Sequence, residues 1–135
     1  MITVFLSGPM RGIQREETVG WRLECRQLMP NVRLLDPMRG RREEETLPSG
    51  RLAVARDLAD VAKADVLLVS DIYSGVSMAG TAIEIHQAKS LGKIVIAFGK
   101  AHRNDYFLSY FIDYWFDSLE EAAAFIERRL NDGDN

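Results

Sequence analysis

The sequence predicts an α/β fold, a five-stranded parallel sheet doubly wound by helices, as a single domain over residues 1–135. Short apolar runs rich in β-branched residues alternate along the chain with amphipathic helical patterns. The apolar runs are continuous rather than alternating, which is typical of parallel strands that helices cover on both faces. With 135 residues, of which 47% are hydrophobic, the chain can bury one core without a metal or a disulfide.

The first half of the chain contains two predicted strands and two predicted helices. The apolar residues 2–6 predict a buried strand, and residues 16–29 predict an amphipathic helix that ends before a proline. Residues 32–35 predict the second strand. The charged sequence RGRREEE lies within residues 39–50, for which we expect an exposed, mobile loop. A second helix is predicted over residues 51–64, with a buried stripe made of Leu52, Ala55, Leu58, Ala59 and Ala62.

The second half repeats the alternation of strand and helix. Residues 66–69 form an unbroken apolar run, which predicts a strand buried on both faces. A helix is predicted over residues 80–91 and a further buried strand over residues 94–97. Residues 110–115 are rich in aromatic residues, and their strand pattern is weaker than that of the earlier strands. We expect the fifth strand there.

The end of the chain predicts one more helix. Ser118 and Glu121 have the spacing of a capping box, so the last helix starts there and runs to about Leu130. The polar residues 131–135 are expected to form a frayed tail.

Composition and charge narrow the function classes. A net charge of −3 and a pI near 5.4 argue against a general attraction to nucleic-acid polymers or to an anionic membrane. No apolar run approaches the roughly 20 residues of a membrane span, and residues 1–9 lack the pattern of a signal peptide. The single cysteine, Cys25, cannot form an internal disulfide, so we expect a cytoplasmic protein. These observations leave two classes of protein, a small enzyme and a small ligand-binding module.

The loop after the first strand is the first candidate binding segment, because ligands of doubly wound sheets bind beyond the carboxyl ends of the strands. Its glycines permit close approach of the backbone to a ligand, and its arginine can bind an anion through two hydrogen bonds. The glycine spacing fits neither the dinucleotide fingerprint nor the phosphate loop. The alternative is a tight turn with a surface arginine. The loop reads S-G-P-M-R-G and contains Gly8, Pro9, Met10, Arg11 and Gly12.

The first turn of the helix predicted after the third strand contains the second candidate, Glu84. A carboxylate there can face the ligand crevice, and the helix N-terminus favours its ionised form. An ionised carboxylate beside a sugar C1′ suits nucleophilic attack through an oxocarbenium-like transition state. The alternative is structural, because Thr81 and Glu84 also have the spacing of a capping box.

Asp57 is the third candidate, since it lies in the first half of its predicted helix and can reach the same edge. With Glu84 it would complete a two-carboxylate site, in which one group attacks and the other handles the leaving base. The alternative is a solvated carboxylate paired with Arg56 or Arg51. Asp65 precedes a strand and belongs to the opposite edge. For His86, His102 and Cys25 we expect no metal or nucleophile role.

Together these segments resemble the nucleoside 2-deoxyribosyltransferase family and its relatives that hydrolyse nucleoside 5′-monophosphates. The resemblance covers most of the chain: S-G-P-M-R-G after the first strand, D-L-A-D-V-A-K-A-D-V-L-L-V, and G-T-A-I-E-I followed by A-K-S-L-G-K-I-V-I. It implies a flavodoxin-like, Rossmann-like single domain that cleaves an N-glycosidic bond through a covalent sugar–enzyme intermediate. By this resemblance Glu84 is the nucleophile, Asp57 assists the departing base, and Arg11 with Gly12 contributes to a phosphate-side pocket. No metal and no organic cofactor is implied.

Two positions differ from the family pattern. Phe5 stands where many members have a tyrosine, which removes a hydroxyl from the site and leaves room near the sugar 2′ position, so ribonucleotides stay possible substrates. Met78, with Ser77 beside it, stands where transferases carry an aspartate that binds the 5′-hydroxyl. Without that carboxylate, and with Arg11 present, we expect a preference for 5′-monophosphates. The substrate-binding residues expected from the motifs are Phe5, Gly8, Pro9, Met10, Arg11, Gly12, Ser77, Met78 and Gly80.

The aromatic residues bear on assembly. Seven of the twelve aromatics fall within residues 106–116, an excess that suits a subunit interface as well as a core. We therefore expect a homodimer or a larger homo-oligomer, as the resemblance also implies. The sequence favours base release from a nucleoside 5′-monophosphate. The alternatives are base exchange on deoxynucleosides and a nucleotide-binding sensor without catalysis. A phosphoacceptor domain fits less well, because no acidic pair follows the first strand. A flavin-binding domain fits less well, because the loop there does not have the hydroxyl-rich sequence that binds a phosphate.

Overall fold

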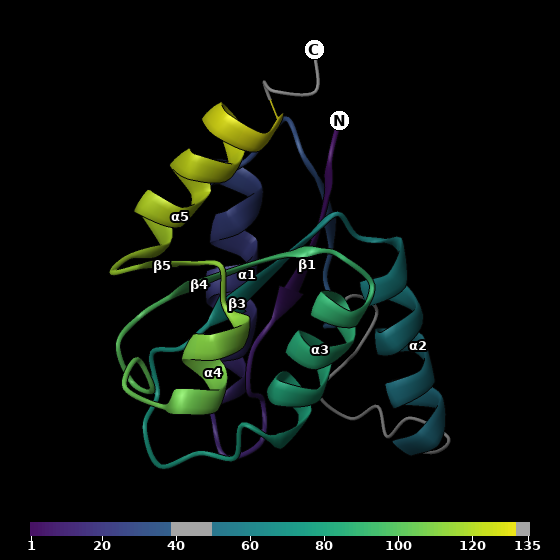
Figure 1. Cartoon of the computed structure of the whole chain (residues 1–135), viewed down its shortest axis with the longest axis vertical. Coiled ribbons are helices and arrows are strands. Elements are labelled where there is room, and N and C mark those ends of the chain that lie inside the picture. Colours follow the sequence, from purple (N-terminus) through teal and green to yellow (C-terminus); the bar gives the residue numbers. More distant parts are fainter. Residues whose placement is uncertain (39–49, 132–135) are drawn as a thin grey trace.

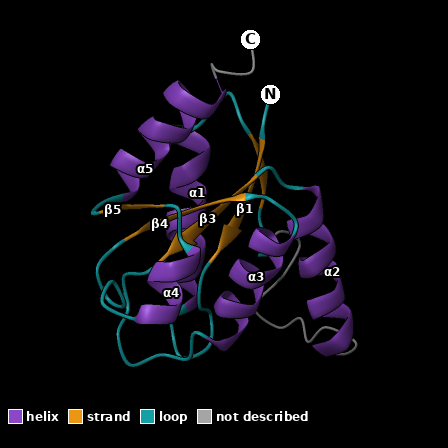
Figure 2. Ribbon diagram, in the orientation of Figure 1, coloured by secondary structure: helices purple, strands orange, loops and turns teal. Residues whose placement is uncertain are grey.

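The computed structural model describes residues 1–38 and 50–131. Within these residues five strands form one parallel sheet in the order β2-β1-β3-β4-β5 (Figure 2). This confirms the predicted parallel α/β sheet. The strands are β1 (Thr3–Ser7), β2 (Arg33–Leu35), β3 (Val66–Ser70), β4 (Ile94–Phe98) and β5 (Tyr114–Phe116). The helices are α1 (Arg15–Leu28), α2 (Gly50–Lys63), α3 (Ala79–Ser90), α4 (Tyr106–Phe111) and α5 (Leu119–Phe125), which continues as the π-helix η1 (Ile126–Asn131).

Helices cover both faces of the sheet (Figure 1). On one face α1 and α5 pack over the sheet around Val4 and Leu6. On the other face α2, α3 and α4 pack over Phe5 and its neighbours. Because successive strand residues point to opposite faces, β1 contributes to both cores and is buried along nearly its whole length. Because β1 lies between β2 and β3, the loop after β1 lies between the segments that follow these two strands at the carboxyl edge.

The prediction of a strand over residues 110–115 is wrong in its bounds. Residues 106–111 form the short helix α4, and β5 contains only Tyr114–Phe116. The side chain of Asp105 caps α4 by accepting a hydrogen bond from the backbone N–H of Leu108 at 2.9 Å. Aromatic residues favour strands only weakly, so this local cap and the packing of Leu108 decide the conformation.

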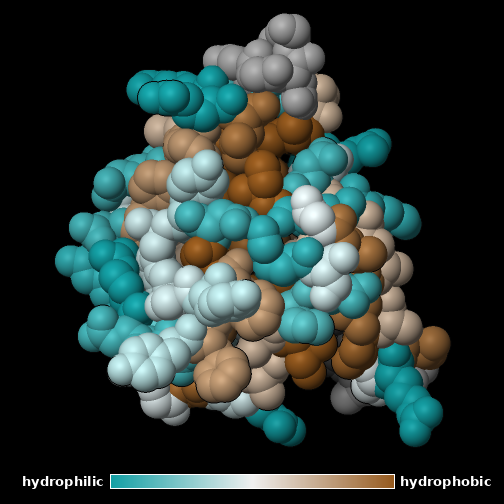
Figure 3. Space-filling view, viewed as in Figure 1, coloured by the Kyte–Doolittle hydropathy of each residue, from teal (hydrophilic) through white to brown (hydrophobic). Residues whose placement is uncertain are grey.

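The predicted buried stripe of α2 is also wrong. Leu52 is 59% exposed, whereas Asp60 and Val61 are the buried residues of the helix. Apolar residues and alanines occur on nearly every side of the sequence GRLAVARDLADVAK, so its pattern does not select one face. The helix packs mainly by its C-terminal end and leaves apolar side chains on the surface. Figure 3 shows brown, hydrophobic side chains at the surface over α2 and α3.

The remaining expectations concern the loop and the two ends of the last helix. Of the loop expected over residues 39–50, residues 39–49 lie outside the described residues, and Gly50 already belongs to α2. Ser118 caps α5 as expected, accepting from the backbone N–H of Glu121 at 3.2 Å. Asn131 is not frayed, because it ends η1 and its side chain accepts from the backbone N–H of Ile2 at 3.2 Å. Residues 132–135 lie outside the described part. None of the described helices is long and apolar enough to cross a membrane.

Candidate functional site

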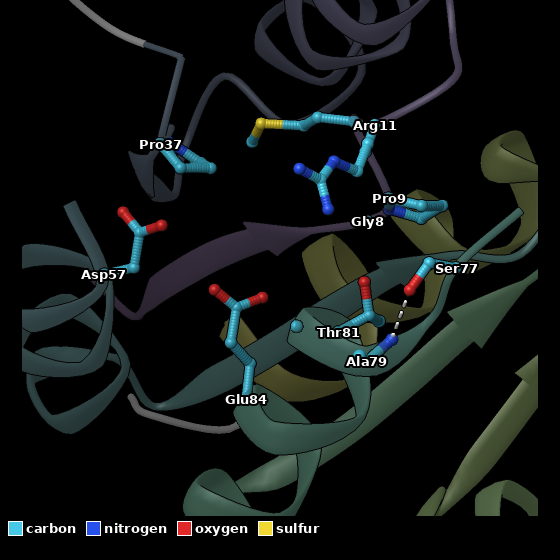
Figure 4. A pocket seen from close by; sticks show the side chains of 11 residues that line it. Gly8, Pro9, Arg11, Pro37, Asp57, Ser77, Ala79, Thr81 and Glu84 are labelled. Carbon is cyan, nitrogen blue, oxygen red and sulfur yellow. Dashed lines mark hydrogen bonds between the residues drawn. The ribbon is translucent and has the colours of Figure 1, made fainter. Parts of the chain in front are cut away.

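A pocket of about 290 Å³ opens at the carboxyl edge of the sheet, where the segments after β1, β2 and β3 meet α2 (Figure 4). The parallel topology brings these segments together, because the carboxyl ends of β1, β2 and β3 lie side by side in the sheet. The lining residues are Gly8, Pro9, Met10, Arg11, Pro37, Asp57, Ser77, Ala79, Gly80, Thr81 and Glu84.

Glu84 enters the pocket from the second turn of α3. Its Oε1 accepts a hydrogen bond of 2.7 Å from the hydroxyl of Ser7, which is fully buried at the end of β1. The capping box of Thr81 and Glu84 does not form, because α3 starts at Ala79 and Met78 is its N-cap. Ser7 at the end of β1 therefore orients Oε1 of Glu84, and the carboxylate of Glu84 lies in the pocket.

Asp57 enters the same space from α2, as Figure 4 shows. Its Oδ1 lies 3.9 Å from Nε of Arg56, so the pairing expected from the sequence is present while the side chain still lines the pocket. Arg56 also donates a hydrogen bond of 2.6 Å to the carbonyl of Pro37, which ties α2 to the segment after β2. The two carboxylates come from the neighbouring helices α2 and α3 and share one pocket.

The end of the pocket away from Asp57 is polar and cationic. Arg11 extends its guanidinium into the open space, with Ser77 and Thr81 below it (Figure 4). The hydroxyl of Ser77 accepts a hydrogen bond of 3.4 Å from the backbone N–H of Ala79, the first residue of α3. The positive end of a 12-residue helix and an arginine at one place favour an anion there.

Three of the residues expected to bind substrate do not line this pocket. Phe5 is fully buried in the core beneath it. Gly12 lies in the following turn with φ +82°, a conformation that favours glycine. Met78 faces a neighbouring hollow on the other side of α3. The other expected residues, including both carboxylates, lie together at the pocket: Gly8, Pro9, Met10, Arg11, Ser77, Gly80, Asp57 and Glu84.

Arg22 of α1 is a residue that sequence reasoning missed. Its side chain is fully buried, donates to the carbonyls of Leu6 and Gly8 at 3.4 Å, and lies 3.6 Å from a carboxylate oxygen of Asp36. Burial lowers the pKa of Arg22 to about 10, although the negative charge of Asp36 opposes this effect. Arg22 thereby joins the ends of β1 and β2 behind the pocket. An arginine in an amphipathic helix is normally a surface residue, so no sequence signal marked it.

Cys25 of α1 is fully buried and does not line the pocket. Burial raises the pKa of the Cys25 thiol to about 12, which leaves it unreactive at neutral pH. In residues 1–38 and 50–131 no three His, Cys, Asp or Glu side chains are grouped so that they could hold a metal ion.

Comparison with known proteins gives matches at the level of structure. No protein-family model and no curated protein sequence matches the chain. A conserved protein from Enterococcus faecalis V583 has a TM-score of 0.67 and 18% identity, covering 90% of this chain and 93% of its own. The 2-deoxyribosyltransferase from Bacillus psychrosaccharolyticus has a TM-score of 0.70 and 18% identity, covering 90% of both chains. The 2-deoxyribosyltransferase from Leishmania mexicana has a TM-score of 0.69 and 19% identity, covering 96% of this chain and 99% of its own. The expected resemblance is confirmed for the fold.

Proposed function

We propose that this chain is an enzyme that cleaves the N-glycosidic bond of a deoxynucleoside and transfers the sugar to a second base. The observation that carries the proposal is the pair of carboxylates in one pocket, with Glu84 oriented by the Ser7 hydroxyl and Asp57 opposite it. The likeness in fold to two proteins named as 2-deoxyribosyltransferases supports transfer rather than simple hydrolysis.

The geometry suggests how each carboxylate acts. The Ser7 hydroxyl orients the carboxylate of Glu84 through Oε1, and this carboxylate attacks the sugar C1′. A bond forms between Glu84 and C1′ while the bond from C1′ to the base nitrogen breaks, and Asp57 donates a proton to the departing base. A second base then attacks C1′, loses its N–H proton to Asp57, and releases Glu84.

A second candidate function is hydrolysis of nucleoside 5′-monophosphates, in which water resolves the intermediate. Arg11, Ser77 and the N-terminus of α3 at one end of the pocket favour this substrate. Ser77 lines this end of the pocket and Met78 faces away from it, so neither brings a negative charge beside a phosphate. Phe5 lies in the core and does not line the pocket, so the substrate panel includes ribonucleotides to test the sugar 2′ position directly.

One experiment tests both functions. Base release is measured by chromatography on ribo- and deoxyribonucleosides and their 5′-monophosphates, each with and without a second free base. We expect exchange to require the second base, and Glu84→Ala to lower turnover at least about a thousandfold. If no substrate loses its base, or if Glu84→Ala is as active as the wild type, the enzyme proposal is wrong and a nucleotide-binding sensor takes its place.

The same panel separates the two candidates. Net release of base without an acceptor favours the hydrolase, whereas exchange without net release favours the transferase. If Arg11 binds the phosphate, Arg11→Ala should lower kcat/KM for monophosphates about 10- to 100-fold. The kcat/KM for nucleosides should stay nearly unchanged. Equal effects on both substrate types would contradict the phosphate role.

We further propose that the chain acts as a homodimer or larger homo-oligomer. The aromatic side chains of α4 support this, because Tyr106, Phe107 and Tyr110 are each at least 80% exposed. Exposed aromatic residues in one cluster are typical of a subunit interface.

A further inference from the structure

A buried arginine lies directly behind the candidate site. Arg22 of α1 has no exposed surface and is the largest fully buried side chain among the described residues. Its Nη1 donates to the carbonyl of Thr18 at 2.8 Å, one turn earlier in the same helix. Nε and Nη2 both donate to the carbonyl of Leu6 at 3.4 Å, and Nη2 also donates to the carbonyl of Gly8 at 3.4 Å. The guanidinium therefore holds the backbone of β1 on both sides of Ser7.

The register of the sheet shows why a side chain donates to β1 at this place. The pairing of β1 with β2 ends at Phe5 and Leu35. Continuing the same register by two residues would place the nitrogen of Pro37 opposite the carbonyl of Leu6, and a proline nitrogen has no proton to donate. Arg22 donates to that carbonyl instead. On the side of β2, the end of β1 is therefore held by an arginine and not by a strand.

The side chain of Ser7 lies on the opposite face of the sheet from Arg22. Helices α1 and α3 cover opposite faces (Figure 1), and successive side chains of a strand alternate between these faces. Leu6 accordingly packs in the core beneath α1, whereas the hydroxyl of Ser7 donates to Oε1 of Glu84 in α3 at 2.7 Å. Because the direction of a strand side chain follows its backbone, Arg22 controls the direction of the Ser7 hydroxyl through the two carbonyls that flank it.

The residue after Ser7 packs closely against α1. A Cβ added at Gly8 would lie 3.3 Å from the Trp21 ring and 3.7 Å from Nη2 of Arg22. The Trp21 ring also covers the guanidinium, whose Cζ lies 4.5 Å from the ring centroid. Since Gly8 itself lines the pocket, a displacement of the Arg22 side chain would reach the pocket wall through a single residue.

Arg22 carries its positive charge at neutral pH. Burial lowers the pKa of Arg22 to about 10, and the negative charges of Asp36 and Glu84 oppose this effect. Oδ1 of Asp36 lies 3.6 Å from Nε, which makes an ion pair beyond ordinary hydrogen-bond distance. Because the loss of hydration offsets most of the attraction between two buried charges, such a pair adds little net stability over apolar side chains of similar size.

We propose that Arg22 is a positioning residue of the candidate site, which fixes the end of β1 so that the Ser7 hydroxyl orients the carboxylate of Glu84. This inference rests on the proposed function, in which Glu84 is the nucleophile. Arg22 does not line the pocket. It therefore acts on the rate of the chemical step and not on the binding of the substrate.

A purely structural role of Arg22 gives different expectations. Its replacement would then lower the thermal stability, while the molecules that stay folded would keep the kcat of the wild type. A positioning role lowers the kcat of folded protein, leaves KM nearly unchanged and depends on the Ser7 hydroxyl.

The first test is Arg22→Lys in the full chain, assayed well below its unfolding temperature. Lysine keeps the positive charge, but its single ammonium cannot donate to several carbonyls in the planar fork geometry of a guanidinium. We expect kcat for base exchange on deoxynucleosides to fall about five- to tenfold, with KM within about twofold of the wild type. In a Ser7→Ala background the same change should lower kcat less than about twofold, because the hydroxyl through which Arg22 acts is absent.

The second test replaces the buried pair as a whole. Arg22→Met combined with Asp36→Asn leaves neither charge buried without its partner. Asparagine can still accept the backbone N–H of Met38, which Asp36 accepts at 2.8 Å. We expect this double variant to fold and to lose kcat about tenfold, because the donors to β1 are absent.

Met29→Ala is the matched control for lost stability. Met29 is 1% exposed at the end of α1, about two turns from Arg22, and does not line the pocket. The cavity left by this change should lower the thermal stability, whereas kcat should stay within about twofold of the wild type.

A measurement without turnover separates this inference from the proposed function. In protein with ¹³C-labelled glutamate, the carboxyl signal that Glu84→Gln removes belongs to Glu84. We expect this signal to move in Ser7→Ala and in Arg22→Lys, and to keep its position in Met29→Ala. If the wild type releases no base from any substrate, the proposed function is wrong, and the Glu84 signal still tests the role of Arg22.

Several results would overturn the positioning role. One is an equal fold loss of kcat from Arg22→Lys with and without the Ser7 hydroxyl, or an equal loss in Met29→Ala. Another is a wild-type kcat in the double variant, or a Glu84 signal that Arg22→Lys leaves in place. If neither Arg22 variant folds, the residue serves the fold alone and the proposal is wrong.

Discussion

Ser7 is fully buried at the end of β1, and its hydroxyl donates to Glu84 Oε1 at 2.7 Å. This contact spans 77 residues of sequence. Phe5 has no hydroxyl where the family pattern has a tyrosine. The hydroxyl of Ser7, two residues later, contacts the carboxylate of Glu84 instead. Hydrogen bonds to charged groups are stronger than neutral ones, so a single hydroxyl can control the orientation of Glu84.

We expect Ser7→Ala to lower kcat about tenfold, because about 1.4 kcal/mol of orienting hydrogen bond is lost. The KM should change less than twofold, since Ser7 is buried and does not line the pocket. Steady-state kinetics of base release would measure this. Ser70→Ala, at the buried end of the neighbouring strand, is the matched control. Equal losses in the two variants would mean that the hydroxyl has no specific effect on Glu84.

Cys25 allows a test of burial through pH. Its pKa in the folded protein is raised to about 12 from 9.0 by burial, so the unfolded chain releases the thiol proton first. The contribution of the buried thiol to the free energy of unfolding is fully present below pH 9 and is lost as the pH rises from 9 toward 12. Between pH 8.5 and 10 we expect the wild type to lose about 1 kcal/mol more unfolding free energy than Cys25→Ala. Urea denaturation at both pH values measures the difference, and parallel losses would show that the thiol is not buried.

Among the elements, the end of β4 makes a close contact with the segment after β3. Gly99 has φ +109°, and a side chain there would overlap the carbonyl oxygen of Asp71. The carbonyl of Gly99 accepts from Trp115 Nε1 at 2.8 Å, and its N–H donates to Phe116 at 3.0 Å. Gly99 thus joins β4 to β5 and to the segment after β3.

We expect Gly99→Ala to destabilise the protein by about 3 kcal/mol, because it combines an unfavourable φ with overlap against backbone. Gly20→Ala is the control, since Gly20 is exposed within α1 with nothing within 4 Å of an added Cβ. That change should stabilise by about 0.5–1 kcal/mol through helix propensity. Thermal and urea denaturation give both values. Similar stability in the two variants would contradict the tight contact at Gly99.

At the scale of the molecule, the described residues include exposed apolar side chains on two helices, α4 and α2. The outer side of α4 exposes Tyr106, Phe107 and Tyr110, and the apolar residues Leu52 and Val54 of α2 are more than half exposed. A domain of 15.3 kDa with this surface, and with an open pocket at the sheet edge, is suited to association with a second copy.

We expect light scattering at micromolar concentration to give at least twice the chain mass of 15.3 kDa. Tyr110→Glu should weaken association at least about tenfold by placing a charge in the aromatic cluster. Leu23→Glu, on the exposed side of α1 on the opposite face of the sheet, should have no effect. A monomer at all concentrations would exclude the oligomer.

The sequence by itself determined the alternation of strands and helices as far as β4, the parallel sheet and most of the segments that line the site. Residues 66–69 and 94–97 were predictable because continuous apolar runs and helical periodicity are local signals. The topology placed Arg11 and Glu84 at the shared carboxyl edge and let Asp57 reach it, and the structure shows that all three line one pocket.

Only the tertiary structure decided which side chains meet and which faces are covered. Two contacts join residues that are far apart in sequence: the hydrogen bond from Ser7 to Glu84 and the pairing of Asp71 with His102. The burial of Arg22 depends on the elements that pack around it. The orientation of α2 and the helical conformation of α4 likewise depend on packing and on one cap. Local patterns cannot determine these features, because the free energy of a contact depends on the position of both partners.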